Sequence, residues 1–218
     1  MSGRRFESSS PGSAAGDEFP PKAGHPHEIA QLSEAFACTV SGRTAWYVSS
    51  PLTSGERSLE WRRRYSEHGA KATAQLSESF RRDVLALNRG DAARFVEGLR
   101  ARTTQVVINP SALADIPHWT QSDYRVLWAS VIERYVSTVV FRDGWQHSNG
   151  CAWELLTAYV ADRRLLREDL SPLGIAEAQT LVETAISAVG ERQATAFLVA
   201  VFDALNDNRK DREWHASS

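Results

Sequence analysis

Apolar runs alternate with amphipathic stretches along most of this chain. Three short runs rich in β-branched and aromatic residues predict buried strands over 44–49, 105–110 and 137–141, with a weaker fourth over 164–167. Elsewhere apolar residues recur every three or four positions, which predicts helices over 29–36, 71–87, 92–102, 122–135, the segment around Glu154, 175–189 and 192–205. Strands that alternate with helices are typical of a parallel sheet wrapped by helices. We therefore predict an α/β, flavodoxin-like fold with extra C-terminal helices.

The composition divides the chain into four parts. Residues 1–28 are rich in Ser, Gly and Pro and cannot bury enough apolar surface to order themselves, so we expect a disordered tail. The α/β domain is expected over 29–170 and a helical extension over 171–208. A flexible tail is expected over 209–218. The last predicted helix carries an apolar stripe that needs a cover, either the sheet domain or another chain.

Composition also narrows the classes of partner. With 25 Lys and Arg against 27 Asp and Glu, the chain is nearly neutral, which argues against duplex nucleic acid or an anionic membrane surface as partner. No apolar run reaches membrane-spanning length. Two cysteines, Cys38 and Cys151, are too few for a disulfide framework or a zinc cluster, and they fit a reducing cytoplasm. No metal or cofactor is expected.

The candidate chemistry lies where the third predicted strand ends. The segment from Phe141 to Glu154 passes from that strand through a polar turn into a helix. The carboxyl end of a parallel strand is where open α/β sheets bind their ligands. Ser148 or Asn149 can cap the helix, whose free N–H groups and dipole favour an anion. We place Glu154 in the first turn, where the dipole favours the ionised carboxylate.

The first predicted strand ends in a second polar loop, over 49–57. Hydroxyls, backbone N–H groups and an arginine fork can together hold a phosphate, although an ordinary strand-to-helix turn has the same composition. The residues of this loop that can contact a ligand are Ser50, Thr53, Ser54, Gly55 and Arg57.

These elements together resemble a known family. A strand ending Tyr47-Val48-Ser49-Ser50-Pro51-Leu52, a helix entered by Asp123-Tyr124, and a strand followed by Gly144-Trp145-x-x-Ser148-x-Gly150-x-x-x-Glu154 look like the nucleoside 2-deoxyribosyltransferase-like superfamily. The resemblance covers about 44–166, and its most specific part is the Ser-x-Gly-x-x-x-Glu element. Members cleave or exchange the N-glycosidic bond of deoxynucleosides or nucleotides. They commonly assemble into oligomers.

The resemblance implies roles for individual residues. Glu154 stands where the family places its catalytic nucleophile, and the loop over 49–57 corresponds to the side that lines the sugar or its 5′-phosphate. Breaking the bond builds oxocarbenium character at C1′, which a carboxylate can stabilise or attack. We expect Asp143 to be the second carboxyl, in contact with the base or a sugar hydroxyl. The remaining expected substrate-binding residues are Asp123, Trp145, Ser148, Asn149 and Gly150.

Other interpretations stay open. Many members carry an aspartate six residues before the nucleophile, and this chain has Ser148 there, which keeps a hydrogen bond but loses the charge. Periodicity alone makes Glu154 a solvated glutamate, Trp145 a core residue and Asp123 a helix cap.

Alternatives to the nucleoside or nucleotide substrate also remain. A NAD-cleaving glycohydrolase or a phosphoribohydrolase would use the same glutamate with a different leaving group. A non-catalytic nucleotide sensor or toxin-like module would engage a protein partner through the C-terminal helices. Because members of the superfamily that this chain resembles commonly form oligomers, we expect a homo-oligomer, with the stripe of the last helix as a contributor.

Overall fold

The computed structural model describes residues 18–66, 74–189 and 192–216 of the chain. Its helices and strands alternate as the hydrophobic pattern predicts. In chain order they are α1 (Pro26–Val40), β1 (Ala45–Ser49), α2 (Glu56–Ser66), α3 (Ala74–Phe80), the π-helical turn η1 (Arg81–Leu85), α4 (Ala86–Arg100), β2 (Val106–Ile108), the 3-10 turn η2 (Pro110–Ala112), α5 (Gln121–Tyr135), β3 (Val136–Phe141), the 3-10 turn η3 (Trp145–His147), α6 (Asn149–Val160), β4 (Arg164–Arg167), α7 (Ile175–Val189) and α8 (Arg192–Ala216).

The sheet has four strands in the order β2-β1-β3-β4, and all neighbouring pairs are parallel. From β1 the chain passes first outward to β2 and then to the other side of β1, where it forms β3. The carboxyl ends of β1 and β3 therefore flank the point at which the strand order reverses, which is where open α/β sheets bind ligands. The flavodoxin-like α/β fold predicted from the sequence is confirmed.

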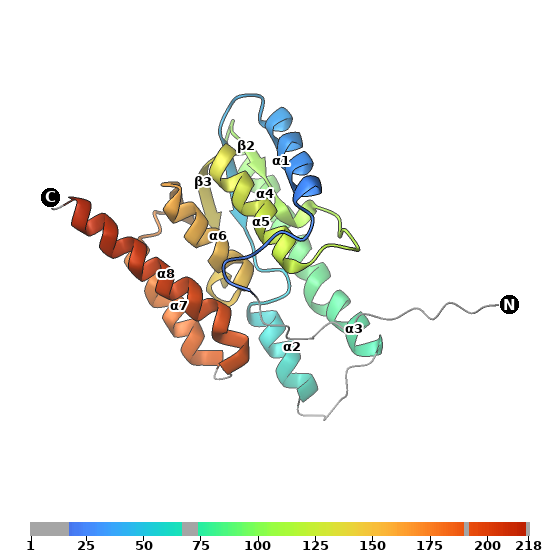
Figure 1. Ribbon diagram of the computed structural model, residues 1–218. Helices are drawn as coiled ribbons and strands as arrows, with labels where there is room; N and C mark the ends of the chain where they lie inside the picture. The colour runs from blue at the N-terminus through green and yellow to red at the C-terminus, as the bar shows by residue number, and fades with distance from the viewer. Residues whose placement is uncertain (1–17, 67–73, 190–191, 217–218) are drawn as a thin grey trace.

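Helices cover both faces of the sheet (Figure 1). On one face, apolar residues of α1, α5 and α6 join Tyr47 and Phe141 in the larger of two cores. On the other face α4 packs Val96 against Val48 and Val140. Strands buried on both faces need no alternation of apolar and polar residues, which explains their continuous apolar runs.

The helix before β2 differs from the sequence prediction. We expected two helices, over 71–87 and 92–102, but the chain runs without a break from α3 through η1 into α4. Gly90 lies inside α4, so a single glycine does not end this helix once its apolar face is packed on the sheet. The expected positions 71–73 lie outside the described residues.

The disordered tail expected over 1–28 is wrong for residues 18–28. Pro26 opens α1, and residues 18–25 form what we call the N-terminal strap, which lies across α5 and α6. Phe19 of the strap makes edge-on contacts with Trp153 and Phe197, each at 5.7 Å between ring centroids. Composition missed the strap because its partners are distant in sequence. Residues 1–17 lie outside the described part of the chain.

The apolar stripe of the last helix is covered by the chain itself. Phe197, Val201 and Leu205 are at most 3% exposed, and α8 lies against α6 and α7 (Figure 1). The stripe is therefore no evidence for a second copy of the chain. The flexible tail expected over 209–218 is helical as far as Ala216. Although α8 is 25 residues long, neither it nor another described helix is apolar enough to cross a membrane.

Candidate functional site

The loops that follow β1 and β3 lie side by side at the carboxyl edge of the sheet. The backbone N–H of Arg142 donates to the carbonyl of Ser49 at 3.0 Å, which continues the strand pairing beyond β3. Gly55 and Gly144 have φ values of +84° and +80°, a region that favours glycine. A Cβ on Gly55 would lie 4.0 Å from the carbonyl oxygen of Gly144, so the two loops are in contact. They form the reversal point of the sheet.

Glu154 is buried beneath these loops. Helix α6 begins at Asn149, with Ser148 as its N-cap, which places Glu154 in the second turn rather than the expected first. Glu154 is only 8% exposed, so the expectation of a solvated side chain is also wrong. Because α6 contacts α5 and α8 as well as the sheet region, the side opposite its main apolar stripe is covered too.

Two hydroxyls of β1 hold the Glu154 carboxylate. Side chains two residues apart on a strand point to the same face, and Tyr47 and Ser49 both face α6. The Tyr47 hydroxyl donates to Oε1 of Glu154 at 2.7 Å, and the Ser49 hydroxyl donates to Oε2 at 2.6 Å. Each carboxylate oxygen therefore has its own donor, which fixes the orientation of the group.

Burial sets the charge of this cluster. It raises the pKa of Glu154 to about 7, although the hydrogen bonds from Ser49 and Tyr47 lower it in part. The expectation of a dipole-stabilised, readily ionised carboxylate is thus wrong, because loss of hydration outweighs the helix N-terminus. Burial and the nearby Glu154 charge raise the pKa of Cys151 to about 12 and that of Tyr47 well above its ordinary value. Near neutral pH, Glu154 alone among the three changes its charge.

Tyr47, Ser49 and Cys151 were not among the expected site residues. The signal for the first two was present in the sequence, because alternation along β1 places them on one face of the strand. Cys151 is a small buried packing residue, since it is 3% exposed and its raised pKa keeps the thiol protonated. The thiol interacts with the Ser49 hydroxyl and lies close enough to Glu154 to be affected by its charge.

The expected N-terminal residues of α6 lie beside Glu154. The Ser148 hydroxyl accepts a hydrogen bond from the backbone N–H of Cys151 at 3.4 Å and so caps the helix. Asn149 and Gly150 form the first turn, and both are partly exposed. These residues line the same edge of the sheet as the β1 loop.

Of the ligand-binding residues expected in the loop over 49–57, some lie at the candidate site and one turns toward a neighbouring helix. The Ser50 hydroxyl oxygen is buried and has no hydrogen-bond partner among the described residues. Thr53 is exposed, Ser54 is half-buried and Gly55 is buried. Arg57 turns to α4, where its Nη1 donates to Asn88 Oδ1 at 2.8 Å and to Asp91 Oδ2 at 2.5 Å. The expected phosphate fork is therefore already engaged by carboxylate and amide oxygens.

Asp143 and Trp145 line a cavity of about 220 Å³ between η3 and α7. The lining also includes Arg167 and Glu177, which form an ion pair, but not Glu154. Asp143 is exposed, whereas Trp145 is 4% exposed and contacts the Phe141 ring at 5.3 Å between centroids. The two expected catalytic carboxyls thus belong to different surroundings.

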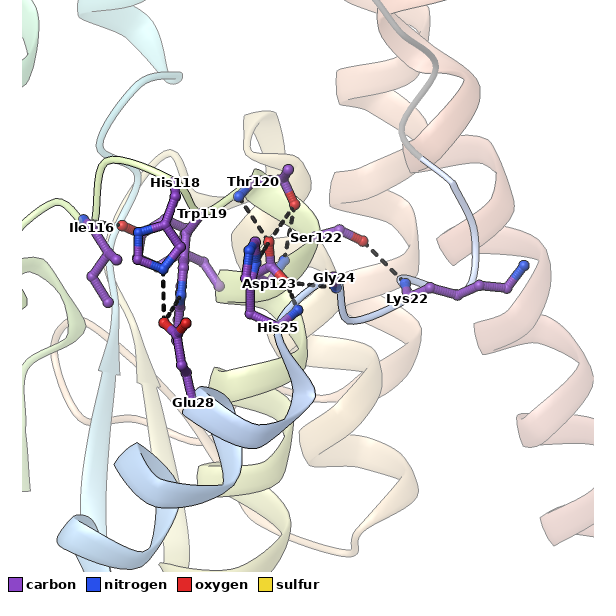
Figure 2. Close-up of polar contacts among 11 residues, drawn as sticks. Lys22, Gly24, His25, Glu28, Ile116, His118, Trp119, Thr120, Ser122 and Asp123 are labelled. Atoms are coloured by element: carbon purple, nitrogen blue, oxygen red, sulfur yellow. Dashed lines mark hydrogen bonds and ion pairs between the residues drawn. The ribbon is translucent and has the colours of Figure 1, made fainter.

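Asp123 has a structural role and lies outside the candidate site. Its carboxylate is fully buried and accepts backbone hydrogen bonds from Gly24 at 2.7 Å, His25 at 3.0 Å and Thr120 at 2.8 Å (Figure 2). Burial opposes ionisation, but these bonds and that from the Thr120 hydroxyl hold the pKa of Asp123 well below its usual range. The helix-cap interpretation is confirmed by the capping box of α5. With both oxygens of its carboxylate engaged in this way, Asp123 is not part of the substrate site proposed below.

No group of three or more potential metal ligands occurs in the described ranges. No family model, no curated protein and no solved structure matches this chain. The resemblance to nucleoside 2-deoxyribosyltransferase-like enzymes consequently rests on the sequence elements alone, and a function has to follow from the geometry around Glu154.

Proposed function

We propose that this protein cleaves or exchanges the N-glycosidic bond of a nucleoside or nucleoside 5′-monophosphate, with Glu154 as the nucleophile. One observation carries the proposal: a buried carboxylate, held by Tyr47 and Ser49, lies where the sheet reverses its strand order. Burying an ionisable group costs stability, so a buried carboxyl in place of an apolar residue is best explained by a task that an apolar residue cannot perform. A carboxyl with a strongly raised pKa in such a place is typical of a functional site.

The proposed chemistry needs only one group that is both held and ionisable. An oxygen of ionised Glu154 bonds to C1′ as the C1′–N bond breaks. The electron pair of that bond passes to the base, which takes a proton from solvent. Water or a second base then attacks C1′ and releases Glu154 as a carboxylate. Tyr47 and Ser49 orient the carboxylate for both steps.

The other substrate contacts that we expect from the sequence are also part of the proposal. Asp143, exposed at the rim of the cavity, contacts the base or a sugar hydroxyl. Ser50, Ser54, Gly55, Ser148, Asn149 and Gly150 line the sugar side. Assembly into a homo-oligomer stays a prediction, although the α8 stripe that suggested it is buried within the chain.

The experiment that tests the proposal is a screen for free base. The full chain is incubated with nucleosides, nucleoside monophosphates or NAD, with and without an acceptor base, and the products are separated by chromatography. We expect base release from a nucleoside or monophosphate. Release of nicotinamide from NAD alone would favour the glycohydrolase alternative. Tight binding of a nucleotide with no released base would contradict the proposal and favour a sensor.

The pH dependence should follow the ionisation of Glu154. A nucleophile must be deprotonated, so kcat/KM should rise with pH through the raised pKa of about 7 and level off above it. Cys151 and Tyr47 titrate far higher and should not contribute. The measurement is kcat/KM for base release across buffers on both sides of neutrality. A rate that falls through the same range would assign Glu154 the role of an acid instead.

Tyr47→Phe tests the positioning of the carboxylate. Oε1 of Glu154 would lose its donor, so the pKa of Glu154 should rise further and the ascending limb of kcat/KM should move to higher pH. The plateau should fall roughly tenfold to a hundredfold, as expected for a hydrogen bond to a charged group.

Tyr135→Phe is the matched control for this substitution. The Tyr135 hydroxyl is also buried but has no hydrogen-bond partner in the part of the chain that the structure describes. Tyr135 ends α5, directly before the amino-terminal end of β3. This variant should keep the profile of the parent protein. An unchanged pH profile in Tyr47→Phe would remove Tyr47 from the proposed mechanism.

A further inference from the structure

The cavity between η3 and α7 is a second candidate site, separate from the surroundings of Glu154. One wall comes from the carboxyl ends of β3 and β4 and from the turn η3, and the other comes from α7 and the loop before it. Its volume of about 220 Å³ lies below the roughly 300 Å³ of pockets for drug-sized ligands, so it fits a small molecule. Ligand sites form preferentially at the carboxyl edge of an α/β sheet and where separately packed units meet.

The inner wall of this cavity is apolar. Phe141, Trp145 and Leu173 are at most 5% exposed, and half-buried Leu181 of α7 lies nearer the surface. The rings of Phe141 and Trp145 are neighbours, with 5.3 Å between their centroids. Such a wall favours the apolar part of a ligand, because contact with it removes apolar surface from water.

The charged residues of the lining are Asp143, Arg167 and Glu177, and the Arg167 cation is already neutralised. Its Nε donates to Oε1 of Glu177 at 2.9 Å, and its Nη2 donates to Oε2 of the same carboxylate. Its Nη1 donates to the Ser171 hydroxyl at 2.8 Å and to the Pro172 carbonyl at 2.7 Å. The arginine therefore has little capacity left for an anionic ligand, and the lining as a whole is negatively charged.

The negative charge that remains belongs to Asp143. Its backbone N–H donates to Oε2 of Glu168 at 2.8 Å, and Glu168 itself is paired with Arg142. Among the described residues, none donates a hydrogen bond to the Asp143 carboxylate or forms an ion pair with it. The side-chain oxygen of Gln146, also in the lining, is a second acceptor. Both acceptors suit a ligand that carries several N–H donors and a positive charge.

We propose that this cavity binds a small organic cation, a primary amine whose ammonium group pairs with Asp143 and whose apolar body packs on Phe141, Trp145 and Leu173. The site goes beyond the proposed function, because Glu154 does not line it. An anion is disfavoured by the charge of the lining, and a neutral ligand leaves the carboxylate without a partner. The Asp143 carboxylate can hold an ammonium or contact a substrate, but not both, so an occupied cavity withholds it from the substrate proposed above.

The test is calorimetric titration of three probes into the full chain at neutral pH. Phenethylamine, phenethyl alcohol and phenylacetate share one aromatic ring and differ in charge. The amine should bind roughly tenfold more tightly than the alcohol, the value of a hydrogen bond to a charged group. Phenylacetate should bind most weakly, because its carboxylate faces Asp143.

Three variants locate the binding. Asp143→Asn should weaken amine binding roughly tenfold and leave the affinity for the alcohol unchanged, because it removes the charge but keeps the shape of the side chain. Leu181→Phe reduces the volume of the cavity and should weaken the binding of both probes. Asp203→Asn is the matched control, since it removes the same charge from an exposed position on α8 outside the lining and should change neither affinity.

Each outcome decides for or against the cation site. No binding of phenethylamine, equal affinity for the amine and the alcohol, or parental amine binding in Asp143→Asn would overturn it. Equal losses in Asp143→Asn and Asp203→Asn would show that overall charge attracts the cation, and would overturn it as well. If Leu181→Phe fails to fold, the comparison of the three probes and of the two aspartate variants still decides. None of these measurements involves base release, so the cation site and the proposed function stand or fall separately.

Discussion

Glu154→Gln is expected to abolish base release and, at the same time, to make the fold more stable in mildly alkaline buffer. The amide cannot attack C1′, so turnover should fall by several orders of magnitude. The amide also carries no charge to bury, yet it has nearly the shape of the protonated carboxyl and can still meet the hydroxyls of Tyr47 and Ser49. Loss of activity should thus coincide with a gain in stability.

The gain should depend on pH in a defined direction. The pKa of Glu154 is raised from 4.5 to about 7 in the folded chain, so the folded state binds more protons than the unfolded state between these values. Stability from this group is present below 4.5 and is lost as pH rises through about 7. The full difference is on the order of 3 kcal/mol. The stabilities of the parent and Glu154→Gln should therefore converge in acid, separate progressively between about 4.5 and 7, and differ by a constant amount above neutrality.

Chemical denaturation at several pH values, together with the base-release assay, measures both effects. Glu97→Gln is the matched control, because Glu97 is an exposed glutamate of α4 and its replacement should change neither stability nor activity. A folded Glu154→Gln variant with near-parental turnover would rule out the nucleophile. A variant less stable than the parent in alkaline buffer would show that Glu154 serves to hold α6 on β1.

Deleting residues 1–25 is expected to destabilise the protein strongly, whereas deleting residues 1–17 is expected to remove none of the described contacts. The longer deletion takes Phe19 from its two aromatic neighbours and removes the Gly24 and His25 donors of Asp123 (Figure 2). A fully buried carboxylate that loses its partners costs about 3 to 5 kcal/mol. For a chain of this size that lowers the melting temperature by roughly 10 °C.

The strap also supports the site indirectly. Trp153, which Phe19 contacts, is adjacent to Glu154 on α6 and donates its indole N–H to the carbonyl of Arg125 at 3.2 Å. The measurement is thermal unfolding of the two truncated chains. Asp123→Ala removes the acceptor of the strap's hydrogen bonds and should also destabilise the protein strongly. Asp143→Ala, which replaces an exposed aspartate, is the control and should leave the stability unchanged. Equal melting temperatures for the two truncations would show that the strap contributes nothing to stability.

The sheet could be predicted from the sequence because the apolar and β-branched residues of each strand identify that strand without reference to distant parts of the chain. The continuous apolar run before Phe141 has to be covered on both sides, and that requirement alone predicts a central parallel strand. Even the short β4 was placed at its observed bounds, Arg164–Arg167. The strap could not be predicted, because its order comes from contacts with α5, α6 and α8, which lie about a hundred or more residues away along the chain.

The position of the candidate site could be predicted from the sequence, but the burial and the raised pKa of Glu154 could not. The Ser148-x-Gly150-x-x-x-Glu154 spacing located the carboxylate. Its burial was missed because a single-helix pattern shows one apolar face, whereas α6 is enclosed by several neighbours. The raised pKa follows from that enclosure and from nothing visible in the helix itself. That Nδ1 of His147 is buried without a hydrogen-bond partner among the described residues could not be predicted, because it depends on the positions of all the surrounding groups.

The most direct test of the central claim is the mass of the protein during turnover. The full chain is mixed with a nucleoside, quenched in acid within the first turnover, and examined by intact and peptide mass spectrometry. The account predicts that the protein gains the mass of the sugar, with one base released per adduct, and that the adduct maps to Glu154. Base release without any adduct, or an adduct that persists in Glu154→Gln, would contradict it.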